Sequence, residues 1–135
     1  MLKITKPTLL LDKSICLRNI ERMAAKAKLA GLSFRPHCKT HQSHEIANWF
    51  RDFGITSITV SSFDMAEYFV HAGWRDILVA FPFNPLEICR LNELATMARI
   101  SVLVDNIEVI DFLQYAIIPN NKPLTPTKSA STQAP

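Results

Sequence analysis

Residues 35–41 read RPHCKTH and stand where a strand pattern gives way to a helix pattern. The apolar residues from Leu32 to Cys38 predict a strand, and Ser43 is a typical N-cap for the helical sequence that follows. The polar side chains of the heptapeptide therefore lie at the C-terminal end of a predicted strand. In α/β folds, and in barrels especially, functional sites form at these strand ends.

Strand and helix patterns alternate on both sides of this segment. Short runs rich in apolar and β-branched residues predict buried strands, and apolar residues at helical spacing predict the helices between them. The predicted strands are residues 8–11, 32–38, 55–62, 76–81 and 100–106. Strand starts lie about 21 to 24 residues apart, which fits strand–helix crossover units. Continuous apolar runs indicate a parallel sheet that is buried on both faces.

Several residues mark the expected helix ends. Asp12 or Ser14 can cap a first helix, and Gly31 can end it in a left-handed conformation. Asp64 is expected to cap a helix that begins at residue 65, and Pro85 suits the start of the next helix. Two architectures fit this succession, an open doubly wound sheet and a (β/α)8 barrel, and the pattern alone does not separate them.

Composition and charge exclude several classes of protein. The 135 residues carry a net charge of +3, and the basic residues are scattered rather than gathered in the patch that a nucleic-acid-binding protein would show. Three cysteines without a CxxC pair argue against a disulfide framework and favour a reducing compartment. The apolar run 9–11 is too short for a signal peptide or a membrane span. We therefore expect a soluble, cytoplasmic protein.

The end of the chain differs from the rest. Residues 117–135 are rich in Pro, Thr, Ser and Lys, contain no acidic residue and show no apolar periodicity. This composition predicts a disordered tail. Because the periodic pattern stops abruptly, we interpret the tail as the product of an interrupted coding sequence rather than a natural flexible extension.

Lys39 is the candidate nucleophile in the heptapeptide. A lysine that points into a cleft loses hydration, which lowers the pKa of its amine and frees it to attack an aldehyde. Arg35 could act in the same direction through its positive charge. A lysine in a polar loop is also commonly just solvated, so the residues by themselves leave both interpretations open.

The other polar residues near strand ends are less specific. His37, His41 and His44 invite a metal site, but a strand-to-turn path does not give the helical spacing that two histidines need, and no carboxylate or cysteine completes a known pattern. Asp105 and Asn106, like Ser61 and Ser62, could be site residues or merely helix caps. We therefore predict no metal site in this chain.

The segment RPHCKTH resembles the lysine segment RPHxKTH of fold-type III pyridoxal-phosphate enzymes, above all D-threonine aldolases and metal-dependent D-serine dehydratases. Cys38 takes the variable position, the pattern before Asp12 is partly kept, and the resemblance extends over about residues 5–115. It implies that Lys39 forms the internal aldimine with pyridoxal 5'-phosphate. It also implies a cofactor-binding set, which is Lys39, Arg35, His37, Thr40 and His41.

The resemblance further selects the barrel, so residues 1–116 are expected to form the first half of a truncated (β/α)8 TIM-type barrel like the alanine racemase N-terminal domain. It implies a lyase for a small D-amino acid, with a divalent Mn or Zn ion whose ligands lie in a C-terminal domain absent here. Two alternatives remain, a non-catalytic truncated gene product and a racemase-type or homeostasis protein that binds pyridoxal phosphate. A half barrel has open strand edges, so self-association is expected, with no nucleic-acid or membrane partner.

Overall fold

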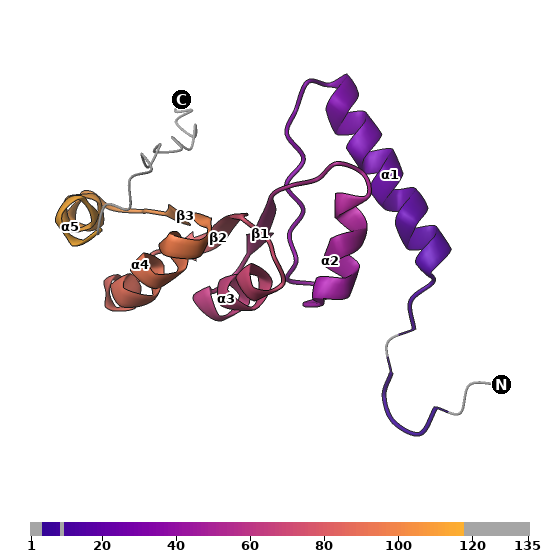
Figure 1. Ribbon diagram of the computed structural model, residues 1–135, viewed down its shortest axis with the longest axis horizontal. Coiled ribbons are helices and arrows are strands. Elements are labelled where there is room, and N and C mark those ends of the chain that lie inside the picture. Colours follow the sequence, from indigo (N-terminus) through magenta and orange to yellow (C-terminus); the bar gives the residue numbers. More distant parts are fainter. Residues whose placement is uncertain (1–3, 9, 118–135) are drawn as a thin grey trace, which may run out of the picture.

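The computed structural model describes residues 4–8 and 10–117 (Figure 1). In this part of the chain, helices and parallel strands alternate from His44 onward, as predicted, whereas no strand separates the first two helices. The elements are α1 (Lys13–Leu29), α2 (His44–Arg51), β1 (Ile58–Val60), α3 (Phe63–His71), β2 (Asp76–Pro82), the 3-10 helix η1 (Pro85–Glu87), α4 (Ile88–Met97), β3 (Arg99–Leu103) and α5 (Ile107–Ala116). The predicted tail lies outside the described residues, apart from its first residue, Ile117.

The three strands form one parallel sheet in the order β1-β2-β3. Ile58 pairs with Ile77, and Ile77 pairs with Ile100, so the strands stand in matched register. The strand order follows the chain without the reversal that marks a doubly wound sheet. The described residues thus form an α/β fragment with an open three-stranded parallel sheet and no closed barrel, and the assignment of this fragment to half of a barrel stays a prediction.

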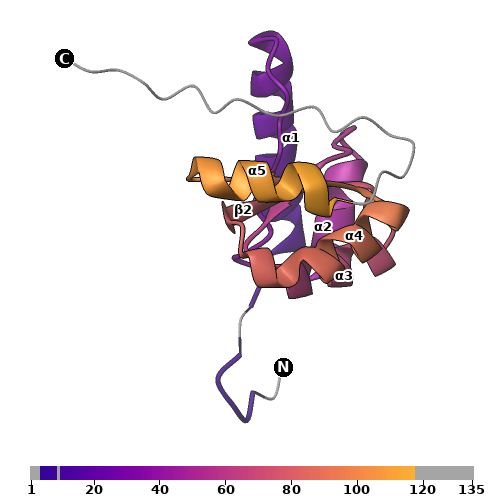
Figure 2. The same cartoon turned by 90° about the vertical axis from the view of Figure 1, so that its left-hand side faces the viewer.

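The core lies between the sheet and the helices α3 and α4, which cover the same face of the sheet (Figures 1 and 2). Alternate strand residues such as Ile77 and Val79 are buried against this layer, whereas Leu78 and Ala80, which point the other way, are only half-buried. The apolar runs predicted a sheet covered on both faces. All three residues of β1 are buried, so the prediction holds for β1, whereas the half-buried Leu78 and Ala80 show that it is wrong for β2.

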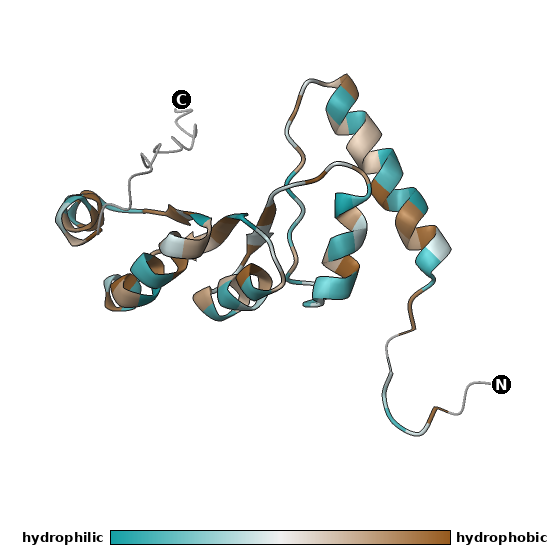
Figure 3. Cartoon of the chain, in the orientation of Figure 1, coloured by the Kyte–Doolittle hydropathy of each residue, from teal (hydrophilic) through white to brown (hydrophobic). Residues whose placement is uncertain are grey.

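Helices α1 and α5 lie at opposite ends of the described structure and bury few residues (Figure 1). Ile20 is the one buried residue of α1, and Leu113 is the one buried residue of α5. Apolar residues therefore remain exposed on both helices, including Leu29 at 91% and Tyr115 at 88%. Figure 3 shows brown, hydrophobic stretches in the strands and also on these two end helices.

Two predicted strands are not formed. Residues 8 and 10–12 have no strand conformation, and Leu9 lies outside the described residues. Of the predicted strand 32–38, only an isolated parallel bridge between His37 and Thr59 is present. A strand requires a hydrogen-bonded neighbour, and Pro36 has no N–H to donate to one.

Most helix ends follow the sequence, with one correction. Asp12 rather than Ser14 caps α1 by accepting a hydrogen bond from the backbone N–H of Ile15. Ser62, and not Asp64, caps α3, because its hydroxyl accepts from the backbone N–H of Met65 while Asp64 already lies in the first helical turn. Gly31 follows α1 with a φ of 65°, the left-handed conformation expected of a glycine that ends a helix.

Cys16, Cys38 and Cys89 are all free, which agrees with the absence of a predicted disulfide. Within the described residues, no helix combines the length and apolar character that crossing a membrane would require.

The open sheet predicts self-association of the 135-residue chain. Among the described strands, β3 has no neighbour on its outer side, and unpaired edges with exposed apolar side chains promote association. We expect sedimentation of the purified chain to show a dimer or larger species. Leu103→Lys, at the end of β3, should shift the distribution towards monomer, whereas Leu86→Lys, in the exposed η1, should not. A monodisperse wild-type monomer with a cooperative thermal transition would contradict this prediction.

Candidate functional site

The segment that carries Lys39 is attached to the outer side of β1. The backbone N–H of Thr59 donates to the Pro36 carbonyl at 2.8 Å, and the backbone N–H of Cys38 donates to the Thr59 carbonyl at 2.8 Å. The Cys38 side chain is completely buried in the core, and this burial raises the pKa of its thiol to about 11. Cys38 therefore remains a neutral thiol at physiological pH and acts as an apolar anchor directly before Lys39.

A tight turn follows the anchor and leads into α2. The backbone N–H of Gln42 donates to the Cys38 carbonyl at 3.0 Å, and Gln42 adopts a φ of 45°, in the left-handed region. Within the turn, the backbone N–H of Lys39 donates to His37 Nδ1 at 3.3 Å. Ser43 then caps α2 by accepting from the backbone N–H of Ile46. The turn presents both Lys39 and Thr40 on the surface.

The exposure of Lys39 differs from the expectation that it points into a cleft. His37 pairs with Thr59, so Lys39 stands two residues beyond this bridge, at the level of Ser61 and the C-terminal edge of the sheet. The prediction that Lys39 lies at the C-terminal edge of the strands is therefore correct. The described residues leave the Lys39 side chain exposed and form no cleft around it.

The pKa values of the two histidines that flank Lys39 are both lowered, which favours the neutral form. Burial, and secondarily the positive charge of Lys39, lowers the pKa of His37 from its ordinary value of 6.5. Burial alone lowers the pKa of His41, whose ring stacks on Phe50 with centroids 6.3 Å apart. His41 Nε2 is shielded from solvent and has no hydrogen-bond partner within the described part of the chain. It is therefore a polar atom that a further group could satisfy.

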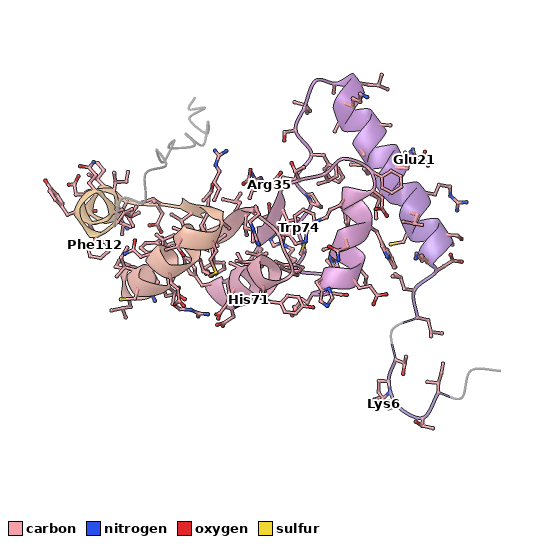
Figure 4. All side chains as sticks on the ribbon, in the orientation of Figure 1. Lys6, Glu21, Arg35, His71, Trp74 and Phe112 are labelled. Carbon is pink, nitrogen blue, oxygen red and sulfur yellow. The ribbon has the colours of Figure 1, made fainter. Side chains whose placement is uncertain are left out.

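Arg35 is not brought together with the other predicted site residues. Its guanidinium forms an ion pair with Asp76 at 2.8 Å and donates to the Ile58 carbonyl at 3.0 Å. Ile58 and Asp76 are the first residues of β1 and β2, so Arg35 reaches the N-terminal edge of the sheet (Figure 4). Lys39 lies at the other edge, four residues on, or about 13 Å along an extended chain.

A depression of about 390 Å³ lies along the same edge as Lys39, beyond the ends of β1 and β2. Hydroxyl and amide groups face it from Ser61, Ser62 and Asn84, and aromatic rings face it from Phe81 and Phe83. Strand-end position had marked the two serines as candidates. Asn84 and the phenylalanines were missed, although Phe81 ends the predicted strand 76–81 and Phe83 and Asn84 come within three residues of its end.

The remaining polar candidates have structural roles. Asn106 caps α5 through a hydrogen bond from the backbone N–H of Val109 at 2.9 Å, and its amide also donates to Asp105. The backbone N–H of His44 donates to the Tyr68 hydroxyl at 3.1 Å. Over residues 4–8 and 10–117, no three His, Cys, Asp or Glu side chains are grouped so that they could hold a metal ion.

Comparison with known proteins adds sequence and structural relatives, although no protein-family model matches the chain. The chain is 32% identical over 117 residues to a D-threonine aldolase from Arthrobacter sp., covering 86% of this chain and 31% of that enzyme. It is 38% identical over 85 residues to a D-threo-3-hydroxyaspartate dehydratase from Delftia sp. (strain HT23), covering 63% of this chain and 22% of that enzyme. The solved structure of D-threonine aldolase from Filomicrobium marinum superposes with a TM-score of 0.77 at 32% identity, covering 83% of this chain and 31% of that protein.

The chain is thus homologous over most of its length to D-threonine aldolase, D-threo-3-hydroxyaspartate dehydratase, D-serine dehydratase and an alanine racemase-like protein. This homology confirms the resemblance predicted from RPHCKTH. The chain spans about a third or less of the length of each of these relatives.

The lowered pKa of His41 predicts a pH-dependent stability. Unfolding returns His41 to its ordinary pKa of 6.5, so between the folded pKa and 6.5 the unfolded chain binds more protons. The stability contributed by neutral His41 is therefore complete above about pH 6.5 and is lost as the pH falls below it. We expect the loss of Tm between about pH 7.5 and pH 5.5 to be smaller in His41→Phe, which keeps an aromatic ring against Phe50.

His71→Gln is the matched control, because it replaces an exposed histidine of α3. In thermal melts at equal protein concentration, His71→Gln should lose as much Tm between about pH 7.5 and pH 5.5 as the wild type does. An unchanged pH dependence in His41→Phe would contradict the assignment.

Proposed function

We propose that Lys39 is the attachment point for pyridoxal phosphate and that the chain forms part of a lyase acting on a D-amino acid. The observation that carries this proposal is the position of Lys39, which follows a buried anchor at the C-terminal edge of a parallel sheet, within a segment that resembles the lysine segment of such enzymes. Homology to an aldolase and two dehydratases of D-amino acids supports the reaction class.

Two features of the described residues support the binding of a cofactor at this edge. The exposed amine of Lys39 is accessible to an aldehyde, and the depression along the same edge combines aromatic walls with hydroxyl and amide groups. A planar, phosphorylated ring requires these two kinds of contact. The buried, unpartnered Nε2 of His41 is a further polar atom available near the attachment point.

Each residue of the segment would have its own task. Lys39 Nζ would bond to the aldehyde carbon of the cofactor with loss of water, and Thr40 would offer its exposed hydroxyl at the rim. Neutral His37 and His41 can accept or donate a hydrogen bond without adding positive charge beside the amine. When bound, the cofactor supplies an electron sink for the carbanion formed at the substrate Cα.

The relatives include an aldolase and two dehydratases, so aldol cleavage of a D-amino acid and loss of its β-hydroxyl group are both candidate reactions. The resemblance implies a Mn or Zn ion in intact relatives, and the described residues contain no cluster that would hold one. Homology to an alanine racemase-like protein supports a second candidate, a racemase-type protein that binds the same cofactor. Assay for racemisation beside lyase activity distinguishes the two.

Covalent trapping tests the attachment point. After incubation of the 135-residue chain with pyridoxal phosphate and reduction with borohydride, we expect the pyridoxyl group on the peptide that contains Lys39. The label should be absent in Lys39→Ala and unchanged in Lys28→Ala, which alters an exposed lysine of α1. A label on another lysine, or no label at all, would count against the assignment.

The 135-residue chain by itself is expected to show little or no lyase activity. It matches only 31% of the Arthrobacter aldolase and 22% of the Delftia dehydratase, so most of the residues that those enzymes have are not present in it. The assay uses D-threonine and D-serine with pyridoxal phosphate and Mn²⁺ or Zn²⁺. Clear turnover that disappears in Lys39→Ala would overturn this expectation.

A further inference from the structure

Arg35 reaches the sheet edge opposite to Lys39, and we propose that it is a positioning residue for Lys39 rather than a contact of the cofactor. In this proposal the Arg35–Asp76 pair fixes segment 35–41 to the sheet and thereby sets where Lys39 stands. The functional part of the inference rests on the proposed attachment of pyridoxal phosphate at Lys39. The structural part does not depend on it.

The guanidinium of Arg35 joins the segment to two strands at once. Its NH2 group donates to Asp76 Oδ1 at 2.8 Å, and its NH1 group donates to the Ile58 carbonyl at 3.0 Å and more weakly to the Asp76 carbonyl at 3.4 Å. Both partners of the ion pair are about three-quarters buried, with side-chain exposures of 27% and 28%. The planar, forked guanidinium suits this simultaneous bonding, which a lysine ammonium could not reproduce.

Segment 35–41 has few other ties to the sheet. The two backbone hydrogen bonds to Thr59 join it to β1, and the described structure shows no ladder pairing for residues 32–36. Pro36 cannot donate a bond of its own. Arg35 therefore adds side-chain hydrogen bonds to this backbone pairing and to the buried Cys38 side chain, and its bond to Asp76 extends past β1 to β2.

The position of Arg35 argues against direct contact with a cofactor held at Lys39. Its polar partners are the first residues of β1 and β2, whereas Lys39 and the depression lie at the opposite ends of these strands. Asp76 is also 4.0 Å from Arg99, its register partner on β3. The pair is thus part of a network that crosses the N-terminal edge of the sheet.

Hydrogen exchange on the full chain tests the positioning role without any cofactor. The readouts are the backbone amides of Cys38 and Thr59, whose hydrogen bonds hold the segment on β1. We expect Arg35→Gln and Asp76→Asn each to raise exchange at these amides roughly tenfold, the effect of losing one charge-assisted hydrogen bond. The double variant should be no worse than Arg35→Gln, because Arg35→Gln already removes the bond to the Asp76 carboxylate.

Matched variants separate this effect from general destabilisation. Arg90→Gln removes an ion pair of similar geometry, to Asp64 and Glu67, but on the surface of α3 and α4. It should leave exchange at Cys38 and Thr59 unchanged. Arg35→Lys keeps the charge yet cannot bond two strands, so it should fall between wild type and Arg35→Gln. If Arg35→Lys matches wild type, the two-strand arrangement is not required and the proposal fails.

Borohydride trapping of pyridoxal phosphate on the same variants tests the functional part. We expect Arg35→Gln and Asp76→Asn to reduce labelling of Lys39 to a similar extent. Reduced labelling in Arg35→Gln alone, with normal exchange at Cys38, would show that Arg35 contacts the cofactor and would overturn the proposal. If wild type takes up no label, the proposed function fails, while the exchange measurements still decide the positioning role.

Discussion

The backbone pairing of Pro36 and Cys38 with Thr59 is the interaction on which the rest of the site depends. These two hydrogen bonds set the register of segment 35–41 against β1, and register decides which edge of the sheet each side chain reaches. Cys38 is driven into the core, Lys39 emerges at the C-terminal edge, and Arg35 returns to the N-terminal edge. This short pairing thus places the buried side chain of Cys38 directly before the exposed amine of Lys39.

The same sheet explains why the amine is exposed. Helices α3 and α4 cover one face, and their packing around residues such as Trp74 and Phe69 gives the sheet a firm core on that side. On the opposite face, Leu78 and Ala80 are only half-buried. The depression of about 390 Å³ lies beside the strand ends. The lysine of such an enzyme is normally shielded from water, because desolvation lowers the pKa of its amine. Further protein surface would have to cover this face to shield Lys39 in the same way.

Much of the fold could be predicted from local sequence, because buried strands and capped helices leave strong periodic signals. Helices α2 and α5 begin where Ser43 and Asn106 indicate, and the sheet is parallel as the apolar runs imply. The run 32–38 was predicted wrongly as a strand, since only Pro36 and Cys38 are buried and the segment makes a single bridge, between His37 and Thr59. The Arg35–Asp76 pair joins residues 41 positions apart, a contact that no local pattern reveals.

The central claim is that the strand-edge position makes Lys39 the residue that takes up pyridoxal phosphate. An absorbance titration of the purified chain with the cofactor tests it most directly, because a lysine-bound cofactor absorbs differently from the free aldehyde. We expect a new absorbance band that saturates with added cofactor in the wild type and is lost in Lys39→Ala. A band of equal strength in Lys39→Ala, or spectra that simply add protein and free cofactor, would contradict it.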